Sequence, residues 1–415
     1  MSPSDTQLPD TQGPALKRTL SLSLVTYYGI GNILGAVIYV LLGKVAGYAG
    51  SQTPISFLLA SILAGFTALS YAELSARYPL SAGAVIYIQE GIGMRWLSLL
   101  VGILLVITGI VSAATIARGF VGYLDLFVQV PERAAIIVLL LCLGGLAAWG
   151  IGQSVLVAAL MTLVEAGGLL FILWVLKPEA GALASTLNSL VLVPDAVTAQ
   201  GIFLGAFLAF YAFIGFEDMA NIAEEVRNPR RNMPLSIILA LLISTLLYFA
   251  IALVAISAVK PAQLAGSDAP LAFLYQQATG SDPVLISAIS LVAIINGALI
   301  QIIMASRICY GMGRKGWIPA WLAQVHPATR TPVVATALIT LLVILMALWL
   351  PIEGLARATN FFILTVFTLV NISLWRVKHM TTSDYRGFTV CRWIPVAGAL
   401  GSALFIALQS AASLY

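Results

Sequence analysis

The chain has 415 residues, of which 60% are hydrophobic and 9% are charged, and its mean hydropathy is +1.00. A soluble domain carries roughly 25% charged residues, so this chain cannot cover a water-facing surface with polar side chains. The composition excludes a soluble globular protein and indicates a polytopic membrane protein, for which no nucleic-acid partner is expected. The formal net charge of +4 is informative through its placement along the chain.

Cysteines and histidines are few and scattered. Cys142, Cys309 and Cys391 show neither a disulfide framework nor metal-binding spacing, and the only histidines, His326 and His379, lie in polar linkers. We therefore expect no metal site and no cofactor.

A spanning helix needs roughly 20 mostly apolar residues. After a polar tail (1–19) that we interpret as cytosolic, this length predicts eleven spans. They are residues 20–43, 54–76, 95–124, 133–149, 151–176, 200–222, 234–259, 283–312, 332–350, 354–375 and 395–414. We expect residues 20–375 to form a ten-helix core, 376–394 an inner linker and 395–415 an eleventh transmembrane helix.

The basic residues predict the orientation of the spans. Most of the 21 lysines and arginines fall on the side of the first tail, and a positive excess of this kind marks the cytoplasmic side. The exceptions are Lys44, Arg118, Arg133, Lys177, Lys260 and Arg357. With eleven spans, we expect a multi-pass protein of the cell membrane with its N-terminus in the cytoplasm and Tyr415 outside.

The first span contains an unusual cluster of glycines. Gly29, Gly31 and Gly35 flank Asn32 within seven residues. Each glycine weakens a helix by roughly 1 kcal/mol relative to alanine, so the cluster predicts an interruption. Irregular backbone at membrane depth must be buried in protein or line a cavity, where its N–H groups can bind an anion. The alternative is that the glycines only allow close helix packing.

The sixth span carries a second interruption. Gly215 lies in its middle and is followed directly by Glu217 and Asp218, two carboxylates that are costly in hydrocarbon unless they face a cavity or pair. The first span is expected to run from the inside of the membrane to the outside, and the sixth from the outside to the inside. This arrangement predicts an inverted repeat of five plus five helices, about 20–176 and 200–375, with a substrate site at the midplane.

Four segments together resemble the amino acid–polyamine–organocation transporter superfamily, of the amino acid permease type. They are residues 29–35 (GIGNILG), 213–217 (FIGFE), 224–234 (EEVRNPRRNMP) and 305–316 (ASRICYGMGRKG). The resemblance covers about residues 20–375. It implies an all-α, LeuT-like five-plus-five fold with broken first and sixth helices, and secondary transport of amino acids by proton coupling or exchange.

The resemblance also implies the substrate contacts. The expected substrate-binding residues are Gly29, Ile30, Gly31, Gly35, Tyr211, Ala212 and Ile214. The amides around Ile30 and Gly31 would take the substrate carboxylate, and the carbonyls near Tyr211, Ala212 and Ile214 would take its ammonium group. Tyr211 would cover the pocket from outside, and Glu217 would act as a gating acid. Val37 departs from the family pattern, because many members have a further glycine there.

Two further carboxylates lie within apolar segments. Glu73 is four residues before Arg77, a spacing that favours pairing on one helix face. Glu165 is the only charge in its span. Burial disfavours a charged carboxylate, so Glu165 could exchange a coupling proton near neutral pH. It could instead bind a metal cation or cationic substrate, or serve as a structural hydrogen-bonding group.

The leading hypothesis is a secondary active transporter for an amino acid or related amine, coupled to protons or possibly to sodium. The alternatives are a transporter of polyamines or other organic cations, and a membrane amino-acid sensor that does not transport. An intramembrane enzyme is not expected, because no nucleophile–base pair or metal cluster lies within a span. The sequence does not predict the oligomeric state.

Overall fold

The computed structural model describes residues 15–35, 37–124, 127–178, 180–191, 195–267, 269–349, 353–380 and 385–412. Within them the chain is helical and contains no strand; one β-bridge joins Leu20 to Val226. The predicted all-α class is confirmed. The C-terminal Tyr415 lies outside the described residues.

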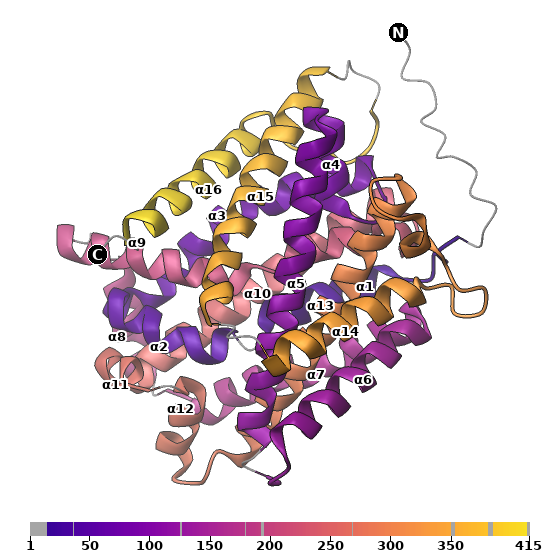
Figure 1. Ribbon diagram of the computed structural model, residues 1–415. Helices are drawn as coiled ribbons and strands as arrows, with labels where there is room; N and C mark the ends of the chain where they lie inside the picture. Colours follow the sequence, from indigo (N-terminus) through magenta and orange to yellow (C-terminus); the bar gives the residue numbers. More distant parts are fainter. Residues whose placement is uncertain are drawn as a thin grey trace.

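The helices form a bundle in which segments distant in sequence lie side by side (Figure 1). They are α1 Leu22–Leu34, α2 Val37–Ala49, α3 Thr53–Arg77, α4 Gly83–Ile92, α5 Arg95–Leu124, α6 Glu132–Trp149, α7 Ile151–Leu176, α8 Ala180–Val191, α9 Ala196–Phe210, α10 Pro229–Ala258, α11 Pro261–Ala265, α12 Pro270–Thr279, α13 Val284–Arg314, α14 Val333–Trp349, α15 Glu353–Met380 and α16 Trp393–Ala412. Short 3₁₀ helices are η1 Gly50–Gln52, η2 Tyr211–Phe213, η3 Phe216–Glu225 and η4 Ala320–Ala323.

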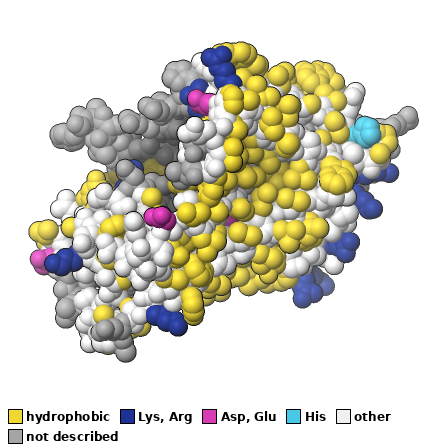
Figure 2. All heavy atoms as spheres, turned by 90° about the horizontal axis from the view of Figure 1, so that it is seen from below, with side chains coloured by type: hydrophobic (Ala, Val, Ile, Leu, Met, Phe, Trp, Pro, Cys, Tyr) yellow, Lys and Arg dark blue, Asp and Glu magenta, His cyan; other side chains and the backbone are white. Residues whose placement is uncertain are grey.

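Every predicted span except the first and the sixth corresponds to a single helix. Within the described residues, eight helical stretches are long and apolar enough to cross a membrane, and α1, α14 and α16 contribute shorter apolar helices. The number of crossings and the division into two repeats remain predictions. Figure 2 shows a broad hydrophobic surface with most of the visible Lys and Arg side chains at its edges, as a lipid-facing surface requires.

Two long helices organise the core. α13 packs against α5, α7 and α14, and α10 packs against α3 and α1. This arrangement encloses α1 between α7, α10 and α13. The first helix is therefore surrounded by protein, as a broken helix at membrane depth must be.

The predicted pair of Glu73 and Arg77 is present, with Arg77 Nη2 2.6 Å from Glu73 Oε1. Glu73 is fully buried, and its second oxygen contacts Lys378 Nζ at 2.7 Å and accepts a hydrogen bond from Val390 N at 2.8 Å. This carboxylate therefore fastens the segment between α15 and α16 to the end of α3. Its partners identify a structural role.

Candidate functional site

The first interruption lies at Gly35, the last of the three predicted glycines and later than Ile30 and Gly31. α1 continues through Ile30 and Gly31, and the chain turns at Gly35, whose φ of +24° lies in the range that favours glycine. Inside a helix the N–H groups bond to carbonyls four residues earlier, so the amides of Ile30 and Gly31 belong to the helix and not to the break. α2 begins at Val37, whose side chain lies outside the described part of the chain, as does Ala36.

The two earlier glycines allow other elements to approach α1. A Cβ at Gly31 would collide with Thr162 Oγ1 of α7 and lie 2.6 Å from Asn296 Nδ2 of α13. A Cβ at Gly29 would collide with the side chain of Met219 on η3. The packing interpretation therefore applies to Gly29 and Gly31.

The second interruption lies where the sequence predicted it. α9 ends at Phe210, one 3₁₀ turn (η2) follows, and the backbone is extended at Ile214. Gly215 has a φ of +137°, which other residues rarely adopt, and η3 begins directly after it. The sixth predicted span is therefore broken at Gly215.

The carbonyls predicted to take the ammonium group lie at this break. Tyr211 O accepts a hydrogen bond from Ile214 N at 3.4 Å, and Ala212 O lies 3.1 Å from the hydroxyl of Tyr248 on α10. The same hydroxyl lies 2.6 Å from Ile33 O near the end of α1, and it can donate to one carbonyl at a time. Tyr248 thus connects the two broken ends, and each carbonyl keeps a lone pair for a further donor.

Asn32 joins the breaks directly. Its Nδ2 donates to Gly215 O at 2.6 Å and to Asp218 Oδ2 at 2.8 Å. Gln301 of α13 donates to the same Asp218 oxygen at 3.1 Å. Asp218 is 6% exposed, and among the described residues no cation forms an ion pair with it. Two amide groups therefore hold a buried carboxylate at the meeting point of the two breaks.

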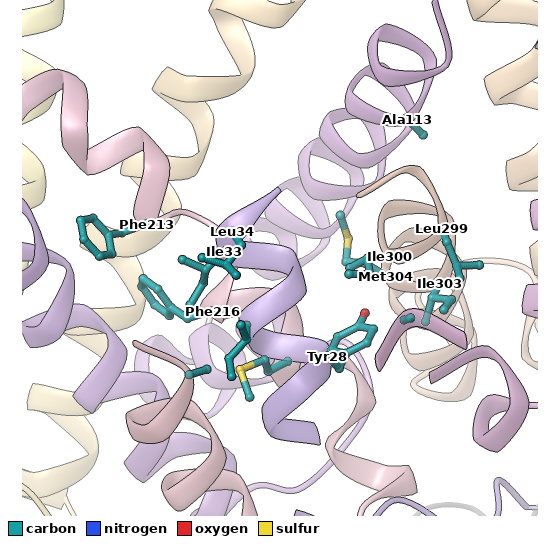
Figure 3. Close-up of a cluster of buried hydrophobic side chains, with 14 of the residues drawn as sticks. Tyr28, Ile33, Leu34, Ala113, Phe213, Phe216, Leu299, Ile300, Ile303 and Met304 are labelled. Carbon is teal, nitrogen blue, oxygen red and sulfur yellow. The ribbon is translucent and has the colours of Figure 1, made fainter. Parts of the chain in front are cut away.

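An apolar layer surrounds these polar contacts. Figure 3 shows the aromatic side chains of the second break on one side of the end of α1 and aliphatic side chains of α13 on the other. The buried residues are Ile33 and Leu34 of α1, Phe213 and Phe216 of the break, and Leu299, Ile300, Ile303 and Met304 of α13. In such a low-dielectric environment a made hydrogen bond is strong and an unmade one is costly.

The predicted gating residues lie beside the second break. Glu217 is 7% exposed, and its Oε2 accepts a hydrogen bond from Gly215 N at 2.7 Å. Tyr211 is half-buried, and its ring packs edge-on against Phe207 with 5.5 Å between centroids. Their roles as gate and lid remain predictions.

Glu165 lies buried on α7 against α13. Asn296 Nδ2 donates to Glu165 Oε1 at 2.8 Å and to Thr162 Oγ1 at 3.2 Å. The other oxygens of this group, Glu165 Oε2 and Asn296 Oδ1, are buried without a hydrogen-bond partner among the described residues. The predicted isolated carboxylate thus has an amide partner 131 residues later in the chain.

Ion pairs fasten the end of η3 to α13, a feature to which the sequence assigned no role. Arg307 and Glu225 are both fully buried, with Nε and Oε2 3.4 Å apart, and Arg314 Nη1 lies 3.0 Å from Glu224 Oε1. The backbone N–H of Leu20 donates to Glu225 O at 3.1 Å, which ties the segment before α1 to the same place. This end of the broken sixth helix is therefore closely held in the structure.

Within the described residues no group of three or more His, Cys, Asp or Glu side chains is placed to hold a metal ion, and Cys142, Cys309 and Cys391 are free thiols. The polar groups at the breaks are backbone groups, side-chain amides, carboxylates and the hydroxyl of Tyr248.

Similar proteins of known sequence are transporters. The branched-chain amino acid permease BcaP of Bacillus subtilis is 28% identical, over 93% of this chain and 86% of its own. The methylthioribose transporter of the same bacterium is 29% identical, over 91% and 85%. The vacuolar cationic amino acid transporter 2 of Arabidopsis thaliana is 29% identical over 90% of this chain, which covers 62% of that protein.

The fold is also that of a solved transporter. A Na⁺-coupled sialic acid symporter in a substrate-bound outward-open state matches 96% of this chain and 90% of its own, with a TM-score of 0.63 and 12% sequence identity. This similarity supports the predicted LeuT-like fold. The model of the amino acid permease family matches residues 19–413. The chain therefore belongs to the amino acid permease family of the amino acid–polyamine–organocation superfamily, and it is a multi-pass membrane transporter.

Proposed function

We propose that the protein is a secondary active transporter that moves an amino acid or related amine by alternating access, with its substrate between the two breaks. The observation that carries this proposal is the direct contact of the breaks through Asn32, Gly215 and Asp218. Interrupted helices that meet inside a membrane protein expose unbonded N–H groups on one side and carbonyls on the other. An α-amino acid presents a carboxylate that can bind the N–H groups and an ammonium group that can bind the carbonyls.

We place the substrate carboxylate at the first turn of α2, just after the turn at Gly35, because the first N–H groups of a helix have no partner within it, whereas Gly35 N itself donates to Gly31 O at 3.2 Å. The carbonyls of Tyr211, Ala212 and Ile214 would receive the ammonium group. Gly29, Ile30 and Gly31 would then support the site by holding α1 against its neighbours.

We propose Glu165 as the proton-coupling group. It is buried, receives one amide donor from Asn296, and has one oxygen without a partner among the described residues. A coupling carboxyl group must be able to accept a proton, and a single neutral donor leaves room for that change. A cation at this place is the alternative, and a sodium gradient would then drive uptake.

A cationic amino acid is a second candidate substrate, and one observation favours it. Asp218 lies at the junction of the breaks with amide donors but no cationic partner among the described residues, so it could attract a positively charged side chain. The relatives are named for branched-chain amino acids, cationic amino acids and methylthioribose, so their names leave both candidates open.

We further propose that the arginine-rich end of the bundle, which includes the end of α3 and the start of α10, faces the cytoplasm of a cell membrane. A reporter fused at Tyr415 should then be active only outside. Activity only on the cytoplasmic side would mean that a crossing has been miscounted.

The test of function is uptake into proteoliposomes of a panel of labelled neutral and cationic amino acids and amines. It should be run with a pH gradient, with a sodium gradient and with preloaded substrate. Accumulation of one amino acid against its gradient supports secondary transport. Binding of a ligand without uptake under any of these conditions would identify a sensor instead.

A further inference from the structure

Two adjoining crevices lie at the arginine-rich end of the bundle, away from the breaks. One has a volume of about 770 Å³ and lies between the start of α10 and residues 385–388, and the other has a volume of about 400 Å³ and lies between Arg18 and the same helix start. Arg230 and Arg231 line both. Arg386 lines the larger one.

The arginines of these crevices differ from the three buried or partly buried arginines at this end of the molecule that have an acidic partner. Arg77, Arg307 and Arg314 are each paired with a glutamate. In contrast, Arg18, Arg230, Arg231 and Arg386 are exposed and form no ion pair within the described part of the chain, and no described Asp or Glu lines either crevice. The start of α10 adds the positive end of a 30-residue helix. The crevices therefore attract an anion.

A neutral donor lies beside the same space. Tyr385 lines the larger crevice, and its hydroxyl is buried without a hydrogen-bond partner among the described residues. Its ring is fixed by the Arg77 guanidinium, which lies 4.0 Å from the ring centroid. Burial raises the pKa of the Tyr385 hydroxyl, which therefore keeps its proton and can donate to an anionic oxygen.

The larger crevice continues into an apolar surface. Pro234, Leu235, Gly387 and Phe388 complete its lining. From Leu235 the exposed side chains Leu242 and Leu246 follow along the same face of α10, at intervals of one or two helical turns. A free anion would use the arginines alone, whereas a molecule with an anionic head and a hydrocarbon chain would use both parts.

We propose that this crevice binds an anionic glycerophospholipid, with its phosphate between Arg230, Arg231 and Arg386 and one acyl chain along the exposed leucines of α10. Basic pockets at the cytoplasmic ends of membrane helices are suited to such headgroups. The proposal is independent of the transported substrate, because no residue of the crevice lies at the two breaks.

The test is a lipid titration of the purified full-length protein in mild detergent, followed by native mass spectrometry. Dioleoyl phosphatidylglycerol is compared with dioleoyl phosphatidylcholine, which has the same chains and no net charge. The double variant Arg230→Gln/Arg231→Gln should lose about tenfold in affinity for the anionic lipid. The matched control Arg376→Gln/Arg392→Gln removes two exposed charges at the same end and should change it by less than about twofold.

Three outcomes would overturn the proposal. They are equal losses in the two double variants, no loss in either, and displacement of the lipid by inorganic phosphate, which would identify a free-anion site. If the crevice double variant does not fold, Tyr385→Phe replaces it. This variant should weaken binding of the anionic lipid by about tenfold, as expected for one lost hydrogen bond to a charged group, without changing that of the zwitterionic lipid.

Discussion

Two buried carboxylates are linked to consecutive positions of α1, Glu165 through Asn296 and Asp218 directly, and they are held differently. Glu165 belongs to the group that packs against α1 at Gly31, and Asp218 bonds to the side chain of Asn32. Consecutive helical residues point about 100° apart, so the two acids lie on different sides of α1. Asp218 connects the two breaks, whereas Glu165 connects α7 to α13.

The difference in bonding suggests a difference in role. One oxygen of Asp218 receives two amide donors from two elements, so any change in its position disturbs both breaks. Glu165 receives one donor, and its second oxygen has no partner among the described residues. We infer that Asp218 maintains the geometry of the substrate site, while Glu165 is available to change its protonation state.

The largest effect is expected at the contact between the breaks. A Cβ at Gly215 would lie 2.8 Å from Asn32 O, and its φ of +137° alone costs about 1–3 kcal/mol for another residue. Gly215→Val should therefore abolish substrate binding in the folded fraction. The control is Gly50→Val, where φ is also positive but no atom lies within 4 Å of the added Cβ. Equal binding by the two variants, measured with labelled substrate, would show that the contact is unimportant.

The next largest effect is expected for the hydrogen bond between Asn32 and Asp218, which we call the clamp. Asn32→Leu leaves the Asp218 carboxylate with fewer donors and should destabilise the fold by about 3 kcal/mol, as for a buried charge that loses its partner. Asn32→Leu/Asp218→Leu removes both groups, so its destabilisation should be smaller than the sum of the two single variants. Unfolding in detergent measures all three. Strict additivity would argue against the clamp.

The proposed gating residues, Glu217 and Tyr211, allow substrate binding to be compared with the conformational change that limits turnover. Glu217→Gln keeps an acceptor for Gly215 N, so it should leave equilibrium binding within about twofold and slow turnover by about tenfold. Tyr211→Ala should instead weaken binding more than membrane insertion. Equal losses of binding and turnover in Glu217→Gln would remove the acid from the gate.

The smallest effect is expected at Tyr248, whose hydroxyl reaches both broken ends. Tyr248→Phe keeps the ring and should cost about 1 kcal/mol of stability, as for one lost hydrogen bond. Thermal unfolding of the purified variant checks this value. A loss several times larger would mean that the hydroxyl, and not Asn32, is the main link between the breaks.

The sequence predicted the fold well because length and hydropathy determine membrane spans. The long helices agree with their predicted ranges, and Gly215 with its two carboxylates correctly predicted the second break. Helices α4 and α8 were missed, because 10 and 12 residues are too few to register as spans.

The site was less predictable, because its contacts join distant residues. Gly29, Gly31 and Gly35 are alike in sequence, and only the neighbours Met219, Thr162 and Asn296 distinguish the two packing glycines from the one that turns. Likewise, Asn32 and Asp218 are 186 positions apart, so no local pattern predicts their pairing. The paired carboxylates predicted a site near Gly215, but not that Asp218 is the acid that bonds to Asn32 of the first break.

The central claim, that Glu165 carries the coupling proton, is tested most directly by Glu165→Gln in proteoliposomes with an inward proton gradient. Glutamine mimics the protonated acid and keeps an acceptor for Asn296, so exchange of preloaded substrate should persist while gradient-driven accumulation disappears. The control Glu132→Gln alters an exposed carboxylate at the start of α6 and should accumulate substrate normally. Loss of binding at every pH would instead mark Glu165 as a ligand for a cation. Accumulation by Glu165→Gln with the pH dependence of the unmodified protein would contradict the claim.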